Sequence, residues 1–73
     1  MLVPKLPRDL SAADVERVLR RLGFDEVHAG AHNVWARGGF TVTVPRHRLI
    51  KVGTLREIIR QAGLTVDEFL EAL

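Results

Sequence analysis

The feature that most constrains the fold of this chain is a glycine pair, Gly38-Gly39, which separates two short runs rich in β-branched and aromatic residues. Such a pair is a strong signal for a two-residue hairpin loop, because glycine readily adopts the positive φ angles of tight hairpin turns. We therefore expect antiparallel strands at residues 33–37 and 40–44, with Pro45 ending the second strand.

The hairpin loop also determines which residues face each other across the two strands. The expected pairs are Arg37 with Phe40, Trp35 with Val42, and Asn33 with Val44. Four apolar residues then share one side of the hairpin, which must pack against helices: Trp35, Phe40, Val42 and Val44. We therefore expect Trp35 to belong to the core rather than to stack on a ligand.

Apolar residues at helical spacing predict a first helix that begins after Ser11. Ser11 and Asp14 have the spacing of a capping box, and Gly23 suits the left-handed position that ends a helix. The apolar stripe of this helix is Val15, Val18, Leu19 and Leu22. Its arginines lie off the stripe and are expected to form a solvated face: Arg17, Arg20 and Arg21.

Two further helices are predicted after the hairpin. Thr54 and Glu57 have the spacing of a second capping box, and Gly63 should end that helix. Thr65 and Glu68 repeat the pattern and predict a short C-terminal helix.

The order of these elements predicts the fold class. Residues 24–29 are expected to form the first strand, so the order is α-β-β-β-α-α. This order favours an α+β fold in which helices pack on one face of a three-stranded antiparallel sheet. No linker or repeat interrupts the chain, so we expect one domain over residues 1–73. Residues 1–9, which include Pro4 and Pro7, should form an extended N-terminal segment.

Composition narrows the kinds of site that the chain can hold. There is no cysteine, which excludes disulfides and thiolate metal sites. No run of about 18 apolar residues is present, so we expect no membrane span and a cytoplasmic location. The net charge is only +2, yet the stretch 37–56 contains several arginines and lysines and no acid. This distribution points to a local anionic ligand.

The middle of that stretch has the residues of a phosphate-binding surface. Arg46, Arg48 and Lys51 precede a helix start whose free amides are expected at 53–55, and cations before a helix N-terminus favour an anion. Such contacts would hold an RNA backbone without reading its sequence. The full candidate set is Arg46, His47, Arg48, Lys51, Thr54 and Arg56. The alternative is a solvated loop.

Several short motifs, together with the element order, resemble the HicA toxin family. They are Leu22-Gly23-Phe24, Gly30-Ala31-His32, Val42-Thr43-Val44-Pro45 and, most specifically, Gly53-Thr54-Leu55-Arg56 leading to Gln61-Ala62-Gly63-Leu64. The resemblance covers nearly the whole chain and implies a fold like that of double-stranded-RNA-binding domains. It also implies a ribonuclease toxin of a type II toxin–antitoxin system, with a HicB-type antitoxin as partner. The family's usual Gly-Ser-His is Gly-Ala-His here, which removes a hydroxyl next to the histidine.

His32 is the residue to which the family's catalytic role carries over. RNA cleavage without a metal needs a base for the 2′-hydroxyl proton and an acid for the leaving 5′-oxygen. Imidazole, with an ordinary pKa of about 6.5, can fill either role near neutral pH. On spacing alone, the alternative is a structural histidine at the start of a strand.

The other two histidines are weaker candidates. His47 lies in the basic segment, where it could be the second proton-transfer group or a phosphate contact. His28 is expected to point to solvent or to the opposite face of the sheet. No pair of histidines lies on a predicted helix with metal-ligand spacing, so we expect neither a metal site nor another cofactor.

Three hypotheses follow for function. The first is a toxin that cleaves mRNA as a metal-independent endoribonuclease, with His32 as acid or base. The second is a non-catalytic RNA-binding module of the same fold, which Ala31 favours. The third is a protein-binding module that docks a partner through the short C-terminal helix.

Overall fold

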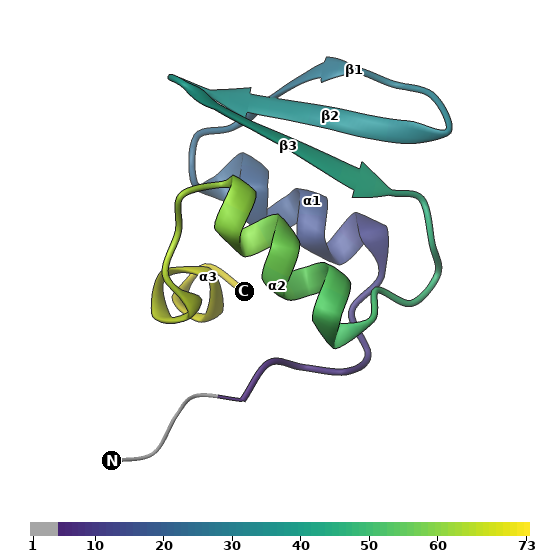
Figure 1. Ribbon diagram of the computed structural model, residues 1–73, viewed down its shortest axis with the longest axis vertical. Coiled ribbons are helices and arrows are strands. Elements are labelled where there is room, and N and C mark those ends of the chain that lie inside the picture. The colour runs from purple at the N-terminus through teal and green to yellow at the C-terminus, as the bar shows by residue number, and fades with distance from the viewer. Residues whose placement is uncertain (1–4) are drawn as a thin grey trace.

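The computed structural model describes residues 5–73, which form six regular elements (Figure 1). In chain order they are α1 (Ala12–Arg21), β1 (Asp25–His28), β2 (His32–Arg37), β3 (Phe40–Pro45), α2 (Val52–Gln61) and α3 (Val66–Glu71). Residues 5–9 of the expected N-terminal segment are neither helix nor strand, and residues 1–4 lie outside the described part. Among the described residues, the helices are too short and too polar to cross a membrane.

The three strands form one antiparallel sheet in the order β1-β2-β3. Gly38, with a φ of 57°, turns β2 into β3, and the three predicted pairs are all present. The helices lie together on one face of the sheet (Figure 1). This confirms the predicted fold class.

Alternation along the strands gives the sheet two unlike faces. We call the covered side the helix face; its central residues are Glu26, Asn33, Trp35, Val42 and Val44. We call the other side the open face; its residues are Asp25, His28, His32, Val34, Ala36, Thr41, Thr43 and Pro45. Every residue of the open face is exposed or half-buried.

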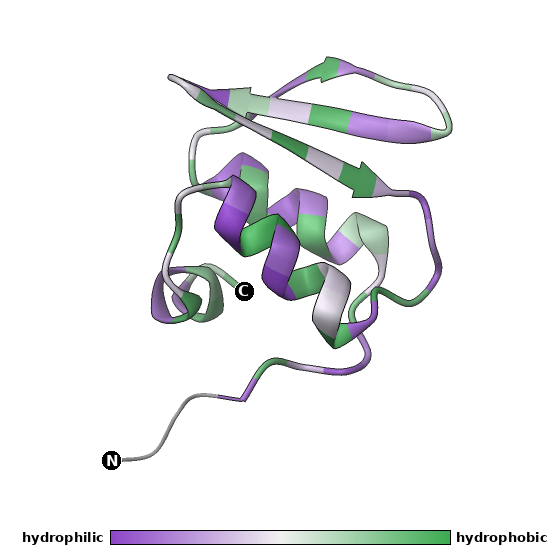
Figure 2. Ribbon diagram, viewed as in Figure 1, coloured by the Kyte–Doolittle hydropathy of each residue, from purple (hydrophilic) through white to green (hydrophobic). Residues whose placement is uncertain are grey.

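The core lies between the helix face and the two long helices. Trp35, Val42 and Val44 are at most 1% exposed and belong to one cluster with the apolar stripes of α1 and α2. Figure 2 shows green, hydrophobic segments alternating with purple ones along both helices, as expected for helices with one buried side. Trp35 is thus a core residue, as expected.

Phe40 is only partly a core residue. It lies on the expected side of the hairpin, but its side chain is 46% exposed. It occupies the first position of β3, at the turn, where its ring packs against Gly63 at the end of α2. A Cβ atom at Gly63 would overlap this ring, so Gly63 leaves the space that the ring fills.

Two of the three predicted capping boxes are present. The Ser11 hydroxyl accepts from the Asp14 amide at 3.1 Å, and the Asp14 carboxylate accepts from the Ser11 amide at 3.0 Å. Thr65 and Glu68 form the same reciprocal pair at the start of α3. The hydrogen bond from the backbone amide of Ser11 lowers the pKa of Asp14, and that of Thr65 lowers the pKa of Glu68.

The predicted capping box of Thr54 and Glu57 is wrong. α2 begins two residues before Thr54, with Lys51 as its N-cap and no side-chain cap. Ile50 is fully buried and its amide donates to the Leu10 carbonyl at 2.7 Å, which sets the helix start. Thr54 is therefore inside the first turn, and Glu57 bonds to Arg60 instead. The unbonded amides are those of residues 52–54, because the Leu55 amide already donates to Lys51.

The first strand is shorter than predicted. β1 covers four residues, because Phe24 turns into the core at 1% exposure and Ala29 belongs to the loop. The pairing of β1 with β2 also shifts between Glu26 and His28, where Val27 has no partner. This is a β-bulge, which places one extra residue on β1.

Candidate functional site

Two candidate regions of the sequence meet at one end of the sheet. His32, the first residue of β2, pairs with Pro45, the last residue of β3. The basic connection, residues 46–51, starts at the next position, and the β1–β2 loop lies at the same end (Figure 1). Figure 2 shows the first part of the connection as a purple, hydrophilic stretch. His32 and the start of the basic connection thus lie at the same end of the sheet.

His32 lies on the open face of the sheet and is exposed. Its neighbour Asn33 is 2% exposed and faces α1, and successive side chains of a strand point to opposite faces. A ligand therefore reaches His32 from the side that the helices leave uncovered. His32 is not part of the buried core.

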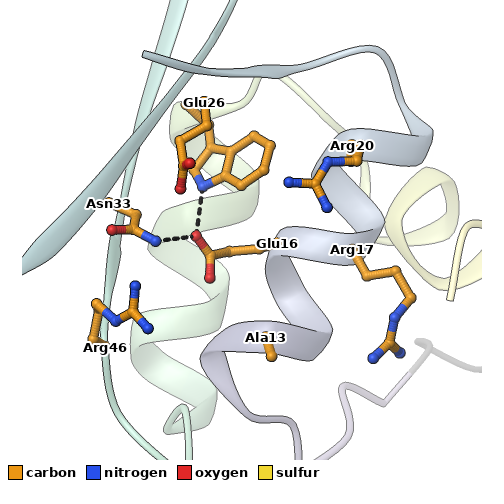
Figure 3. A pocket seen from close by; sticks show the side chains of 8 residues that line it. Ala13, Glu16, Arg17, Arg20, Glu26, Asn33 and Arg46 are labelled. Atoms are coloured by element: carbon orange, nitrogen blue, oxygen red, sulfur yellow. Dashed lines mark hydrogen bonds between the residues drawn. The ribbon is translucent and has the colours of Figure 1, made fainter. Parts of the chain in front are cut away.

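A hydrogen-bond network on the helix face holds the loop before His32. The Oε2 atom of Glu16 on α1 accepts from Asn33 Nδ2 at 2.6 Å and from Trp35 Nε1 at 2.8 Å (Figure 3). The Oδ1 atom of Asn33 in turn accepts from the Gly30 amide at 3.3 Å. The network therefore ties the loop, through Asn33, to α1. These hydrogen bonds position the backbone of His32.

The residues of this network line one side of a shallow hollow of about 390 Å³ (Figure 3). Its charged lining residues are Glu16, Arg17, Arg20, Glu26 and Arg46. Arg20 also lies over the Trp35 ring, 5.0 Å from its centroid, and Arg17 pairs with Asp14 at 3.4 Å. The sequence pattern predicts only a solvated face for these α1 arginines. Their positions on α1 do not reveal that Arg46, from the connection after β3, lines the same hollow.

The basic connection is fixed by its backbone. The His47 carbonyl accepts from the Ala12 amide at 3.1 Å, and the buried Ile50 anchors the far end. The side chains of Arg46, His47 and Arg48 remain exposed and line a second hollow of about 220 Å³ beside the start of α1. Cationic groups on a fixed backbone suit an anionic ligand.

The structure does not bring all predicted phosphate-binding residues together. Lys51 and Arg56 are exposed, but they lie at the start of α2, beyond the buried Ile50. Thr54 is half-buried in the first turn of that helix. Within residues 5–73, the Lys51, Arg46 and Arg48 side chains form no ion pair. Their charges are therefore not neutralised by the fold.

Arg37, the first cation of the acid-free stretch, has a structural role instead. Its guanidinium donates to the Leu22 carbonyl at 2.6 Å, near the end of α1. It also lies over the Phe24 ring, 4.6 Å from the centroid. It does not extend the basic surface of the connection.

Comparisons with known proteins agree with the sequence motifs and the geometry. Residues 12–64 match the family model described as the HicA toxin of bacterial toxin–antitoxin systems. A search among curated proteins gave no significant match. The matched part runs from the first residue of α1 to the residue after Gly63, and thus includes His32 and the basic connection. The chain belongs to the HicA toxin family of bacterial toxin–antitoxin systems.

Proposed function

We propose that this toxin is a metal-independent endoribonuclease that cleaves mRNA in the cytoplasm, with His32 as a general acid or base. The observation that carries the proposal is the position of His32, exposed on the open face at the sheet end where the basic connection begins. An imidazole beside cations can move protons at a phosphodiester that the cations hold.

The basic connection supports the binding part of this proposal. Arg46 and Arg48 supply guanidinium groups that suit phosphate oxygens, and His47 lies between them. Lys51, Thr54 and Arg56 would extend the contact toward α2, along the path of an RNA backbone. Contacts of this kind give affinity without sequence preference. RNA binding should therefore weaken steeply as the salt concentration rises.

A HicB-type antitoxin is the protein partner that we propose. A toxic nuclease must be masked until it is needed, and masking requires a surface that covers His32. A partner with acidic side chains would complement the basic connection at the same time.

The alternative is a non-catalytic RNA-binding module of the same fold. Ala31 favours it, because the residue before His32 has no hydroxyl to orient the imidazole or bind phosphate. In this alternative, the cations hold RNA and His32 only donates a hydrogen bond.

The test is cleavage of a long single-stranded RNA in excess EDTA, read on a denaturing gel. We expect the wild type to cut the RNA and His32→Ala to leave it intact. Thr41→Ala is the matched control, since Thr41 is exposed on the open face at the opposite end of the sheet. Intact RNA with the folded, antitoxin-free wild type would contradict the nuclease proposal and favour the binding module.

A further inference from the structure

The open face carries a second imidazole close to His32. His28, the last residue of β1, pairs with Val34, and Val34 lies two residues after His32 on β2. His28 and His32 are therefore diagonal neighbours on one face of an antiparallel pair. Such neighbours are separated by about 7–8 Å, within reach of long side chains.

The β-bulge is the reason that His28 faces this way. Glu26 pairs with Trp35 on the helix face, so in a regular strand Val27 would take the open face and His28 the helix face. The extra residue at Val27 moves His28 into register with Val34, on the open face. β-Bulges commonly re-aim a side chain beside an active site.

The loop between the two histidines is built to admit the His28 ring. The Nε2 atom of His28 lies only 3.4 Å from where a Cβ atom of Gly30 would be, so the ring rests against this glycine. The Gly30 amide is held by Asn33, which Glu16 fixes to α1. One network thus sets the backbone that carries both imidazoles. Both side chains are exposed, so neither is needed for the core.

We propose that His28 is the second proton-transfer group of the cleavage reaction, acting with His32 on a phosphodiester bound between the two rings. This proposal rests on the proposed nuclease function. His47 is less well placed, because it lies in the connection after β3 and not on the open face with His32. Among the described residues of the open face, the other ionisable group is Asp25, at the far end of β1, beside Ala36.

The chemistry needs one neutral and one protonated imidazole. The neutral imidazole takes the proton of the RNA 2′-hydroxyl while the 2′-oxygen forms a bond to phosphorus. The bond between phosphorus and the 5′-oxygen breaks, and the imidazolium gives its proton to that oxygen. The products are a 2′,3′-cyclic phosphate and a 5′-hydroxyl end. Proton exchange with water then restores both rings.

The experiment compares two substrates in excess EDTA: an RNA with a natural 5′-oxygen leaving group, and the same RNA with a bridging 5′-sulfur at the cut site. A thiolate leaves without a proton, so the sulfur substrate does not need the general acid. We expect His28→Ala and His32→Ala each to slow cleavage of the natural substrate by about 10²–10⁴-fold. We expect the sulfur substrate to restore a near-wild-type rate to one of the two variants and not to the other.

A second variant separates proton transfer from hydrogen bonding. His28→Gln keeps a polar side chain that cannot exchange a proton near neutral pH, so we expect it to be as slow as His28→Ala on the natural substrate. Thr41→Ala should cleave both substrates at the wild-type rate. Thermal unfolding midpoints close to that of the wild type would verify that the histidine variants are folded.

The outcomes distinguish this proposal from the proposed function. If the wild type cleaves and His32→Ala does not, but His28→Ala or His28→Gln keeps the wild-type rate, His28 is not catalytic and the nuclease proposal stands. Rescue of both alanine variants, or of neither, would also overturn the pairing of His28 with His32. If the wild type cleaves neither RNA, the nuclease function itself fails.

Discussion

The side chains on the two faces of the sheet differ in how much they contribute to burial and hydrogen bonding. On the helix face, Trp35 and Asn33 are at most 2% exposed, and both donate hydrogen bonds to the Glu16 carboxylate. On the open face, His28 and His32 are exposed and belong to no buried cluster.

The difference shows how a small domain separates stability from chemistry. A chain of this size buries only about 60% of the surface that it exposes when unfolded, so its single core must be well packed. Trp35 and Asn33 on the helix face cannot be exchanged without loss of burial and of a hydrogen bond. Residues of the open face carry no such requirement, and they can serve a ligand. The following substitutions test this division, beginning with the largest expected effect on stability.

Trp35→Ala should have the largest effect. It removes the largest fully buried side chain and takes a donor from Glu16, so we expect the free energy of unfolding to fall by about 3–5 kcal/mol. Urea unfolding followed by circular dichroism would measure the loss, because the chain has no other tryptophan to report it by fluorescence. Trp35→Phe, which keeps an aromatic ring, should lose less. A loss below about 1 kcal/mol for Trp35→Ala would contradict the core role.

Asn33→Ala should cost about 1.5–3 kcal/mol, because it removes a hydrogen bond to a charged, half-buried carboxylate. The Gly30 amide also loses its acceptor, so its hydrogen exchange should become faster. Asn33→Asp would place a second carboxylate beside Glu16 and should also lower the stability. Adding Glu16→Gln to this variant should recover part of the lost stability. If the stability losses of Asn33→Asp and Glu16→Gln simply add in the double variant, these two side chains are not coupled.

Gly63→Ala should cost about 1–2 kcal/mol. Gly63 has a φ of 69°, which is unfavourable for a residue with a Cβ atom, and the added methyl group would displace the Phe40 ring. Gly39→Ala is the matched control, since nothing lies within 4 Å of its Cβ position and its φ is not positive. Equal thermal unfolding midpoints for the two variants would contradict this account.

Ser11→Ala should cost about 1 kcal/mol through loss of the α1 cap. The capping boxes of Ser11 with Asp14 and of Thr65 with Glu68 also predict that the fold loses stability in acid. The pKa values of Asp14 and Glu68 are lowered in the fold, so the unfolded chain binds protons more readily than the folded one. The two carboxylates contribute fully to folding stability above their ordinary pKa values of 3.8 and 4.5. This contribution is lost as the pH falls through the lower pKa values of the folded state.

Urea unfolding at a series of pH values would measure this loss. With Asp14→Asn and Glu68→Gln together, the fall in stability below about pH 4.5 should become shallower. It should not vanish, because Arg60 also lowers the pKa of Glu57. An unchanged slope would show that the capping carboxylates do not control acid unfolding.

His32→Ala should have the smallest effect on stability, within about 0.5 kcal/mol, although we expect it to slow RNA cleavage by about 10²–10⁴-fold. Thermal unfolding and the cleavage gel, run on the same preparation, would check both outcomes. A stability loss as large as that of Asn33→Ala would mean that His32 is structural, and the division between the two faces would fail.

Local patterns predicted most of the fold because their causes are local. Gly38-Gly39 specified the turn and with it the register of β2 and β3. The caps at Ser11 and Thr65 each depend on a side chain three residues further along, so their spacing is visible in the sequence. The prediction at Thr54 failed because a distant contact, the Ile50 amide on Leu10, sets the start of α2.

For the candidate site, too, some features were predictable from the sequence and others depended on the tertiary structure. The sequence alone determined the family motifs around His32, the basic connection after Pro45, and the order of helices and strands. Only the tertiary structure decided that His28 shares the open face with His32, and that α1 arginines line the same hollow as Arg46. The physical reason is that alternation predicts the face of a side chain only while a strand is regular. The bulge at Val27 reverses that alternation, and pairing with β2 is what reveals it.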